Sequence, residues 1–523
     1  MKRKVFALAM AVVMLGSVAL TGCAGTAPAS SSSPPASGEG AGSGDAALEP
    51  ITFTMMYRDS PNYPFDPEWP ALKAIQEEQN VTLDIRTVPS KDYASKVRII
   101  LSSGDIPDIV SGVDKDIITE YSSSGVLLRI SDYLDKMPNL KAKIEQYDIA
   151  DELDNWYTKD GGLYALPFMN ESLMYNTAPA IRMDVLEEYG LEVPTTYDEL
   201  YEVLKTIKEK RPDTYPMSNY NGAKNIRDIS GASWGIEGSY NGFMYDESKG
   251  GFYYANITDE YKEYTKFLSK LVAEKIADPE IYTGTVDQWR QKVVSDNCVF
   301  CYTWISELAQ INIDGKALNG EDFQMSPIAP LAGPGGQKAS AGGRISQGTV
   351  LPASVADKPY FDRLLAFVDW MCYSDEGTTY TTWGIEGDTF EVKDGQKVFT
   401  DKVLNGDTGI QQSLWNIGAS NNNFTLIFPY DWFVKVLNVP EVETMTEEAR
   451  ANGWFPDAAK VPKLDFAQQE QEKLLLATLN DYVAQMHEQF VYGKLDVDAN
   501  WDQYVAEVHA KGLDDLLALY NAA

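Results

Sequence analysis

The sequence predicts an α/β protein with more than one domain, and three observations support this fold class. The chain has 523 residues, which is long enough for two or more domains of ordinary size. From residue 51 onward, short β-branched runs alternate with amphipathic helical patterns, which is typical of βαβ units around a mostly parallel sheet. A hydrophobic content of 44% supplies an ample core, so disulfide bonds are not needed.

The first half of the body predicts alternating strands and helices in chain order. Ser90 is placed to cap the second helix, and Gly104 is placed to end it as the residue after its last turn. The expected elements are strand 51–57, helix 67–80, strand 81–88, helix 91–103 and strand 106–112.

The remaining chain predicts more elements of the same kinds. Thr196 and Glu199 have the spacing of a capping box, and Leu200 and Ile207 lie on the apolar stripe of the helix that follows. A loop rich in Gly and Pro at residues 330–344 interrupts the pattern. The expected elements are helix 193–212, helix 259–276, strand 297–304, strand 323–331, helix 359–372 and a mostly helical tail from residue 466.

The amino-terminal segment predicts export. Positive charges at residues 2–4 precede the apolar run 5–20, and small residues lead to Cys23. This layout is typical of a bacterial signal peptide over residues 1–22, and the run is short for a bilayer span of about 20 apolar residues. The motif LTGC resembles a lipobox, which implies that Cys23 is the lipidated terminus of the mature chain. An ordinary secretory signal with a chance cysteine is the alternative.

Residues 23–48 predict a flexible, lipid-anchored linker. Ala, Ser, Pro and Gly dominate it, and random-coil scaling gives a reach of about 27 Å. No later segment holds 18 consecutive apolar residues, which predicts a soluble body. We therefore expect an extracytoplasmic protein that is anchored by lipid to the outer face of the cell membrane.

The cysteine pattern leaves two alternatives. Cys298 and Cys301 form a CxxC spacing that a redox or zinc site would use. Their surroundings, NCVFCYTW, are short, apolar and aromatic, and predict a buried strand in which residues three apart lie about 10 Å apart on opposite faces. Because a disulfide needs Cα atoms within about 7 Å, we expect these residues and Cys372 to be inert core cysteines.

Several segments resemble extracellular solute-binding proteins of the maltodextrin-binding type. The most specific is DGGLYALPFMNESLMYN at residues 160–176, and residues 181–207, 367–390 and 490–521 extend the resemblance over nearly the whole mature body. It implies a two-lobed, periplasmic-binding-protein-like fold of type II, with hinged lobes and a central cleft. It also implies delivery of a solute to an ABC transporter permease. We further expect a monomer that uses no cofactor. The expected lobes are 49–168 plus 330–400, and 169–329 plus 401–523.

The residues expected to hold the solute are aromatic and polar side chains near strand ends. Ligands of open α/β sheets bind at the carboxyl ends of strands. A sugar ring packs its apolar face on an aromatic ring, while carboxylates and amides bond its hydroxyls. Trp304 stands where maltodextrin-type relatives carry a sugar platform; for each aromatic residue a place in the core is the alternative. The candidates are Tyr57, Asp59, Asp114, Asn170, Glu171, Trp234, Trp304, Arg344 and Trp415.

Other functional classes fit the sequence less well. The net charge of −33 repels phosphate backbones and predicts no nucleic-acid partner. GASWG around Ser233 fits a nucleophile elbow, but the chain has only two histidines, His487 and His509, both in the helical tail. Residues 496–507 match five positions of a calcium loop, but Trp501 stands where the turn needs Gly, and a helix capped by Asp498 explains the pattern. We expect no catalytic residue and no metal.

The sequence therefore favours a lipoprotein that captures a solute, most simply an oligosaccharide, for import. A glycoside hydrolase, which needs two carboxyl groups about 5–9.5 Å apart, is one alternative. A ligand-sensing or adhesive surface lipoprotein is another. Neutral oligosaccharides are the first choice of ligand, and anionic uronides require that Arg344 or Arg227 lines the cleft.

Overall fold

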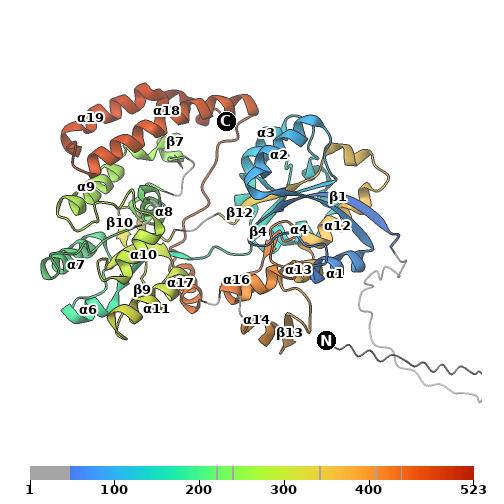
Figure 1. Ribbon diagram of the computed structural model, residues 1–523. Helices are drawn as coiled ribbons and strands as arrows, with labels where there is room; N and C mark the ends of the chain where they lie inside the picture. The colour runs from blue at the N-terminus through green and yellow to red at the C-terminus, as the bar shows by residue number, and fades with distance from the viewer. Residues whose placement is uncertain (1–47, 220–221, 238–240, 341–342, 407–408, 438) are drawn as a thin grey trace, which may run out of the picture. The chain divides into compact units, whose positions relative to one another are not determined.

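The computed structural model describes residues 48–523 except 220–221, 238–240, 341–342, 407–408 and 438. The expected signal peptide, Cys23 and nearly all of the linker lie outside the described residues. The body has the α/β architecture predicted from the sequence, and its elements group into two lobes (Figure 1). Within the described part of the chain, no helix is both long and apolar enough to cross a bilayer.

The first lobe is built on a six-stranded sheet with the order β15-β4-β12-β3-β1-β2. Strands β1, β2 and β3 are parallel, with β2 at the edge of the sheet, whereas β12 runs antiparallel to both β3 and β4. The carboxyl ends of β1, β2, β3, β4 and β15 therefore meet at one edge, together with the amino end of β12. The strands are β1 (Ile51–Asp59), β2 (Val81–Pro89), β3 (Ile109–Asp114), β4 (Leu166–Asn170), β12 (Ile345–Val350) and β15 (Ile427–Phe428).

Helices cover both faces of this sheet. Phe53, Met55 and Tyr57 of β1 belong to one core, and Met56 belongs to a second core on the other face, as the alternation of a strand requires. The helices are α1 (Pro70–Gln79), α2 (Ser90–Ser103), α3 (Lys115–Ser122), α4 (Pro138–Gln146), α5 (Ala150–Asp154), α12 (Phe361–Tyr373), α13 (Asp375–Thr382), α14 (Asp401–Leu404), α15 (Ile410–Trp415) and α16 (Tyr430–Leu437), with short η1 (Ile130–Lys136) and η4 (Ala353–Asp357) and the hairpin β13 (Phe390–Lys393)–β14 (Gln396–Phe399).

The second lobe has a smaller, antiparallel sheet with the order β8-β5-β9. Red helices from the carboxyl-terminal end of the chain lie here beside the green helix α9 (Figure 1). The strands are β5 (Thr177–Arg182), β6 (Phe243–Asp246), β7 (Gly251–Tyr254), β8 (Phe300–Trp304), β9 (Met325–Pro327), β10 (Ala332–Gly333) and β11 (Gly336–Gln337). The helices are α6 (Met183–Tyr189), α7 (Tyr197–Lys210), α8 (Gly222–Trp234), α9 (Asp259–Ala273), α10 (Val286–Val294), α11 (Glu307–Asn319), α17 (Pro440–Ala451), α18 (Phe466–Val491), α19 (Val497–Val508) and α20 (Asp514–Asn521), with short η2 (Glu247–Lys249), η3 (Ala255–Ile257) and η5 (His509–Leu513).

The structure places the lobe boundaries differently from the expected ones. Residues 401–437 were expected in the second lobe, but β15 joins the first sheet, and Ile410 and Trp432 pack in its core. Residues 330–339 were expected in the first lobe, but β10 forms a bridge with Thr196 of the second. The chain therefore crosses between the lobes after β4, before β12 and after α16, so that the body has three crossing segments.

The N-cap predicted for α7 and the buried free cysteines are confirmed, but the reciprocal half of the capping box is not, because the Glu199 carboxylate accepts from the amide and hydroxyl of Thr195. The Thr196 hydroxyl accepts a hydrogen bond from the Glu199 amide and caps α7, whose Leu200 is fully buried. Cys298 and Cys301 are free and fully buried. Burial raises the pKa of the Cys298 thiol to about 12, so it is unreactive at neutral pH.

Candidate functional site

Three of the predicted polar residues lie at the carboxyl edge of the first sheet. Asp59 ends β1, Asp114 ends β3 and Asn170 ends β4, so the sheet topology brings them to one edge. The Asp59 carboxylate accepts the Phe65 amide at 2.9 Å and orders the loop after β1. Asp114 is half-exposed and lies 3.6 Å from the Arg58 guanidinium. This edge presents carboxylates and an amide that can bond to hydroxyl groups.

The aromatic candidates of the first lobe differ in exposure. Tyr57 is fully buried, with its ring 5.3 Å from Phe65 and 5.7 Å from Phe424, so it belongs to the core. Trp415 is partly exposed and lies 4.9 Å from the ring of Tyr63. Sequence reasoning missed Tyr63, although its place in the loop directly after β1 was an available signal. These two partly exposed rings lie beside the loop that carries Asp59.

The first crossing segment begins at Glu171, whose side chain is already engaged. Its carboxylate accepts the Tyr430 amide at 2.7 Å, and its own amide donates to the Phe428 carbonyl at 3.1 Å. The Arg450 guanidinium donates to Ser172 at 2.7 Å and lies 5.0 Å from the Tyr430 ring. Glu171 thus ties the start of the first crossing segment to α16, the helix that leads into the third crossing segment.

Arg344 precedes β12 in the second crossing segment and has a full set of acceptors. Its guanidinium contacts the Glu152 carboxylate at 2.6 Å and the carbonyls of Tyr147 and Asp148 at 2.6 and 2.7 Å. A longer contact of 3.4 Å reaches the Glu171 carbonyl. The charge and most donors of Arg344 are therefore committed to the first lobe and the hinge.

The second lobe contributes one exposed tryptophan beside the hinge. Trp304 ends β8 and pairs in register with Thr177, the first residue of β5 after the first crossing segment. Its side chain is 46% exposed, whereas Trp234 is buried against Tyr197 at 4.8 Å. All eleven tryptophans lie in the described part of the chain, and the other ten are buried or partly buried. Trp304 can therefore offer its ring to a solute, and Trp234 is a core residue in this structure.

A cavity of about 270 Å³ opens beside the same edge of the first sheet. It lies between α3 and the start of α18. These two helices belong to different lobes and contact each other. Lys115, the residue after Asp114, lines it together with Trp156 and Tyr157. Sequence reasoning missed this cavity, because its walls come from segments more than 300 residues apart.

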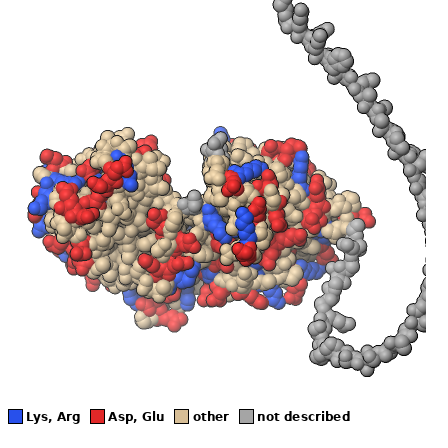
Figure 2. Space-filling model, turned by 90° about the horizontal axis from the view of Figure 1, so that it is seen from below, with Lys and Arg blue, Asp and Glu red and all other residues tan. Residues whose placement is uncertain are grey.

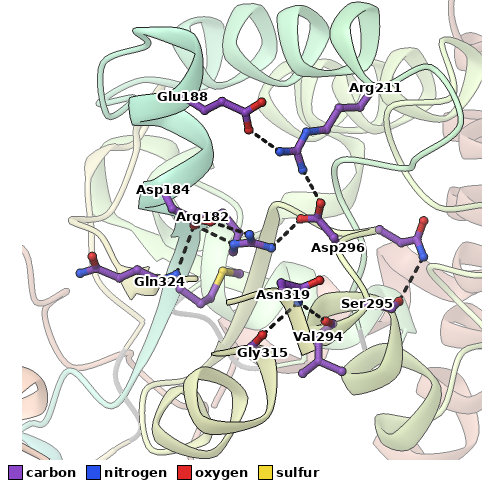
Figure 3. Close-up of polar contacts among 12 residues, drawn as sticks. Arg182, Asp184, Glu188, Arg211, Val294, Ser295, Asp296, Gly315, Asn319 and Gln324 are labelled. Carbon is purple, nitrogen blue, oxygen red and sulfur yellow. Dashed lines mark hydrogen bonds and ion pairs between the residues drawn. The ribbon is translucent and has the colours of Figure 1, made fainter. Parts of the chain in front are cut away.

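The charged cluster at the far end of β5 belongs to the scaffold. The buried Arg182 guanidinium binds Asp184 at 2.6 Å and Asp296 at 2.8 Å, and Arg211 contacts the second oxygen of Asp296 at 2.8 Å (Figure 3). Arg182 also stacks 3.7 Å from the Phe323 ring. Burial opposes ionisation of Asp184, but the Arg182 guanidinium lowers the pKa of this carboxyl below its usual value. Because the charges pair with one another, this cluster leaves nothing for a ligand to neutralise.

The sequence motifs for catalysis and calcium are explained by local structure. The Ser233 hydroxyl is buried and exchanges hydrogen bonds with the main chain of Lys338. The N-cap of α19 is Asp496, not Asp498 as expected, and Asp498 instead binds Lys262 at 2.9 Å. Within the described ranges, no group of three His, Cys, Asp or Glu side chains is arranged to hold a metal.

The surface charge can be followed on one face of the molecule (Figure 2). On the face seen from below, acidic and basic side chains are interspersed over both lobes (Figure 2). With a net charge of −33, the protein has no long-range attraction for anions. Any recognition of an anion must therefore come from a local arrangement.

Comparison with known proteins gives a consistent family. A family model described as bacterial extracellular solute-binding protein matches residues 62–378. The fructooligosaccharide ABC transporter substrate-binding protein FusA of Streptococcus pneumoniae is 26% identical, with 92% of each chain covered. The polygalacturonan/rhamnogalacturonan-binding protein YtcQ of Bacillus subtilis is 27% identical over 77% of this chain and 78% of its own. A solved extracellular solute-binding protein from Bifidobacterium longum subsp. infantis has the same fold, with a TM-score of 0.71 at 19% identity over 91% of this chain and 97% of its own.

Proposed function

Because the chain belongs to the family of bacterial extracellular solute-binding proteins, we propose that it captures an oligosaccharide outside the membrane and delivers it unaltered to an ABC transporter permease. The observation that carries this proposal is the exposed ring of Trp304 at the hinge end of the second lobe, with the polar edge of Asp59 and Asp114 on the first. An aromatic ring and carboxylates are the two kinds of group that a sugar needs. The relatives named for sugars support the same ligand class.

The three crossing segments connect the two lobes and allow them to open and close around the solute. Solute bound between two lobes stabilises the closed arrangement, and a permease can sense the difference between the open and closed states. The engaged side chains of Glu171 and Arg344 keep the crossing segments together while the lobes move. Binding and release change no covalent bond, which fits a family of binding proteins rather than enzymes.

Calorimetry on the soluble chain without its first 23 residues tests the binding step. We expect at least one neutral or acidic oligosaccharide to bind, and the ligand recovered afterwards to have an unchanged mass. At 100 times its Kd, the ligand should add about 2.7 kcal/mol to the free energy of unfolding. A panel without any binder, or a sugar returned in pieces, would overturn the proposal.

The family implies that the protein lies outside the cytoplasm. We further propose that a lipid on Cys23 attaches it to the membrane. The motif LTGC and the linker behind it support this anchor, which needs more than one acyl chain for stable attachment. Cys23→Ala in the full chain should abolish the incorporation of labelled fatty acid into the protein. A Cys23→Ala protein that is labelled as strongly as the wild-type protein would contradict the anchor.

A further inference from the structure

We propose that Lys115 binds a carboxylate of the solute, so that the ligand is a uronate-bearing oligosaccharide; this inference rests on the proposed function. Lys115 follows Asp114 at the carboxyl end of β3 and is the first residue of α3. Its ammonium lies 5.5 Å from the centre of the Trp156 ring. The lysine thus stands at the sheet edge where ligands of this fold class bind.

The cavity beside Lys115 combines cations with aromatic rings. Its lining includes Lys115, Lys463 and Lys473, against only two acids, Asp116 and Glu472. The protein as a whole has a net charge of −33, whereas the charged residues that line this cavity have a positive sum. The rings of Trp156, Tyr157 and Tyr164 line the same space and can pack against the apolar face of a sugar.

The other charges of this cavity have partners. Lys463 binds Asp154 and Lys473 binds Glu470, each at 2.8 Å. Asp116 binds Arg98 at 2.8 Å. The buried Glu472 carboxylate accepts the Tyr520 hydroxyl at 2.5 Å.

Lys115 is the cation that remains uncompensated. Among the described residues, no carboxylate lies within ion-pair distance of its ammonium. Burial lowers the pKa of Lys115 to about 8, which shows that the charged form is poorly solvated there. A partly buried charge without a partner is costly, and a carboxylate brought by a ligand would provide the missing charge-assisted hydrogen bond.

The two arginines that the sequence offered for this role are neutralised within the protein. Arg344 binds Glu152 at 2.6 Å, and Arg227 binds Glu237 at 2.8 Å. We therefore expect Lys115, rather than either of these arginines, to bind the carboxylate of an acidic solute.

The test compares acidic and neutral trisaccharides on matched variants. The probes are trigalacturonate, trimannuronate, the methyl ester of trigalacturonate and a neutral fructose-based trisaccharide. Lys115→Met removes the charge at nearly constant volume. Lys402→Met is the control, because that exposed lysine lies outside the cavity and is paired with Asp388. Calorimetry measures Kd, and thermal unfolding confirms that each variant is folded.

We expect the wild-type protein to bind at least one acidic probe more than tenfold tighter than the uncharged probes. Lys115→Met should abolish this preference, while Lys402→Met should retain it. Binding of the neutral probes alone, or an acid preference that survives Lys115→Met, would overturn the inference and leave the proposed function intact. Failure of all four probes to bind the wild-type protein would count against both.

Discussion

The main-chain amide of Tyr430 donates to the Glu171 carboxylate at 2.7 Å, and this bond joins the first crossing segment to the helix that leads into the third. Arg450, from the other side of the third crossing, reinforces the junction through Ser172. A carboxylate that appeared available for a solute is thus part of the hinge. Replacing a hinge residue should lower stability, whereas replacing a ligand-binding residue should lower affinity.

Replacing Arg344 should cost stability. Arg344→Met leaves the largely buried Glu152 carboxylate without its cation, so the free energy of unfolding should fall by about 2–4 kcal/mol in denaturant titrations. Lys402→Met, which breaks an exposed pair with Asp388, should cost less than about 1 kcal/mol and serves as the control. Loss of ligand affinity without loss of stability would show that Arg344 contacts the solute instead.

Replacing Trp304 should cost affinity. Trp304→Ala removes a ring that is 46% exposed, so we expect ligand affinity to fall about 10- to 100-fold while the unfolding free energy changes by less than about 1 kcal/mol. Tyr245→Ala, at another exposed aromatic residue of the same lobe, is the control and should leave Kd unchanged. Equal Kd values for Trp304→Ala and the wild-type protein would remove Trp304 from the site.

Replacing Lys115 should stabilise the free protein. Because burial lowers its pKa from 10.5 to about 8, the unfolded chain holds a proton that the folded chain loses between these pH values. The free-energy cost of burying the charged lysine is thus fully present below pH 8 and disappears as the pH rises to 10.5. Lys115→Met should raise the unfolding free energy by about 1–3 kcal/mol at pH 7 and by little at pH 10.5. The titratable groups nearest to Lys115 along the chain or lining its cavity are Asp114, Asp116, Tyr157, Tyr164, Lys463, Glu472 and Lys473.

A stability gain together with weaker binding of acid would identify Lys115 as a functional cation. Denaturant titrations from pH 6 to pH 10.5 measure this difference. A variant that is less stable than the wild-type protein at pH 7 would contradict the burial argument, because it would reveal a favourable partner for the ammonium.

His487 should make the protein sensitive to mild acid. Its ring lies 3.1 Å from both the Tyr261 and the Tyr282 hydroxyls, and burial, reinforced by Arg227, lowers its pKa to about 3. The unfolded histidine takes up a proton near pH 6.5, so stability should fall by up to about 1.4 kcal/mol per pH unit from 6.5 toward 3.

His487→Gln should flatten this dependence, since glutamine keeps a donor and an acceptor without titrating. Urea titrations between pH 4 and pH 7 would show the difference. Parallel slopes for His487→Gln and the wild-type protein would mean that His487 is already charged in the folded state.

The sequence predicted the strand ends well and the exposure of the aromatic residues poorly. Asp59 and Asp114 end strands that begin with β-branched, apolar residues, which is a local signal. The burial of Tyr57 depends on Phe424, which comes from a part of the chain more than 360 residues away. No periodicity near Tyr57 indicates that contact. No sequence pattern predicts the two-residue strand β15 either. It is assigned to the first lobe because it pairs with β4.

The sequence by itself determined the α/β class, the Thr196 cap of α7 and the family resemblance, because these follow from hydrogen bonds and apolar stripes within a few residues. The caps expected at Ser90 and Asp498 were wrong, because Pro89 and Asp496 hold those positions. Only the tertiary structure decided which cations are free. Lys115 follows β3 and Arg344 precedes β12, so both lie at the same edge of the first sheet. The residues next to them in the chain do not indicate which of the two has a carboxylate partner. Glu152 neutralises Arg344 from 192 residues away, whereas no described carboxylate reaches Lys115. Charge compensation is a property of packing between distant segments, and so it cannot be deduced from neighbours in the chain.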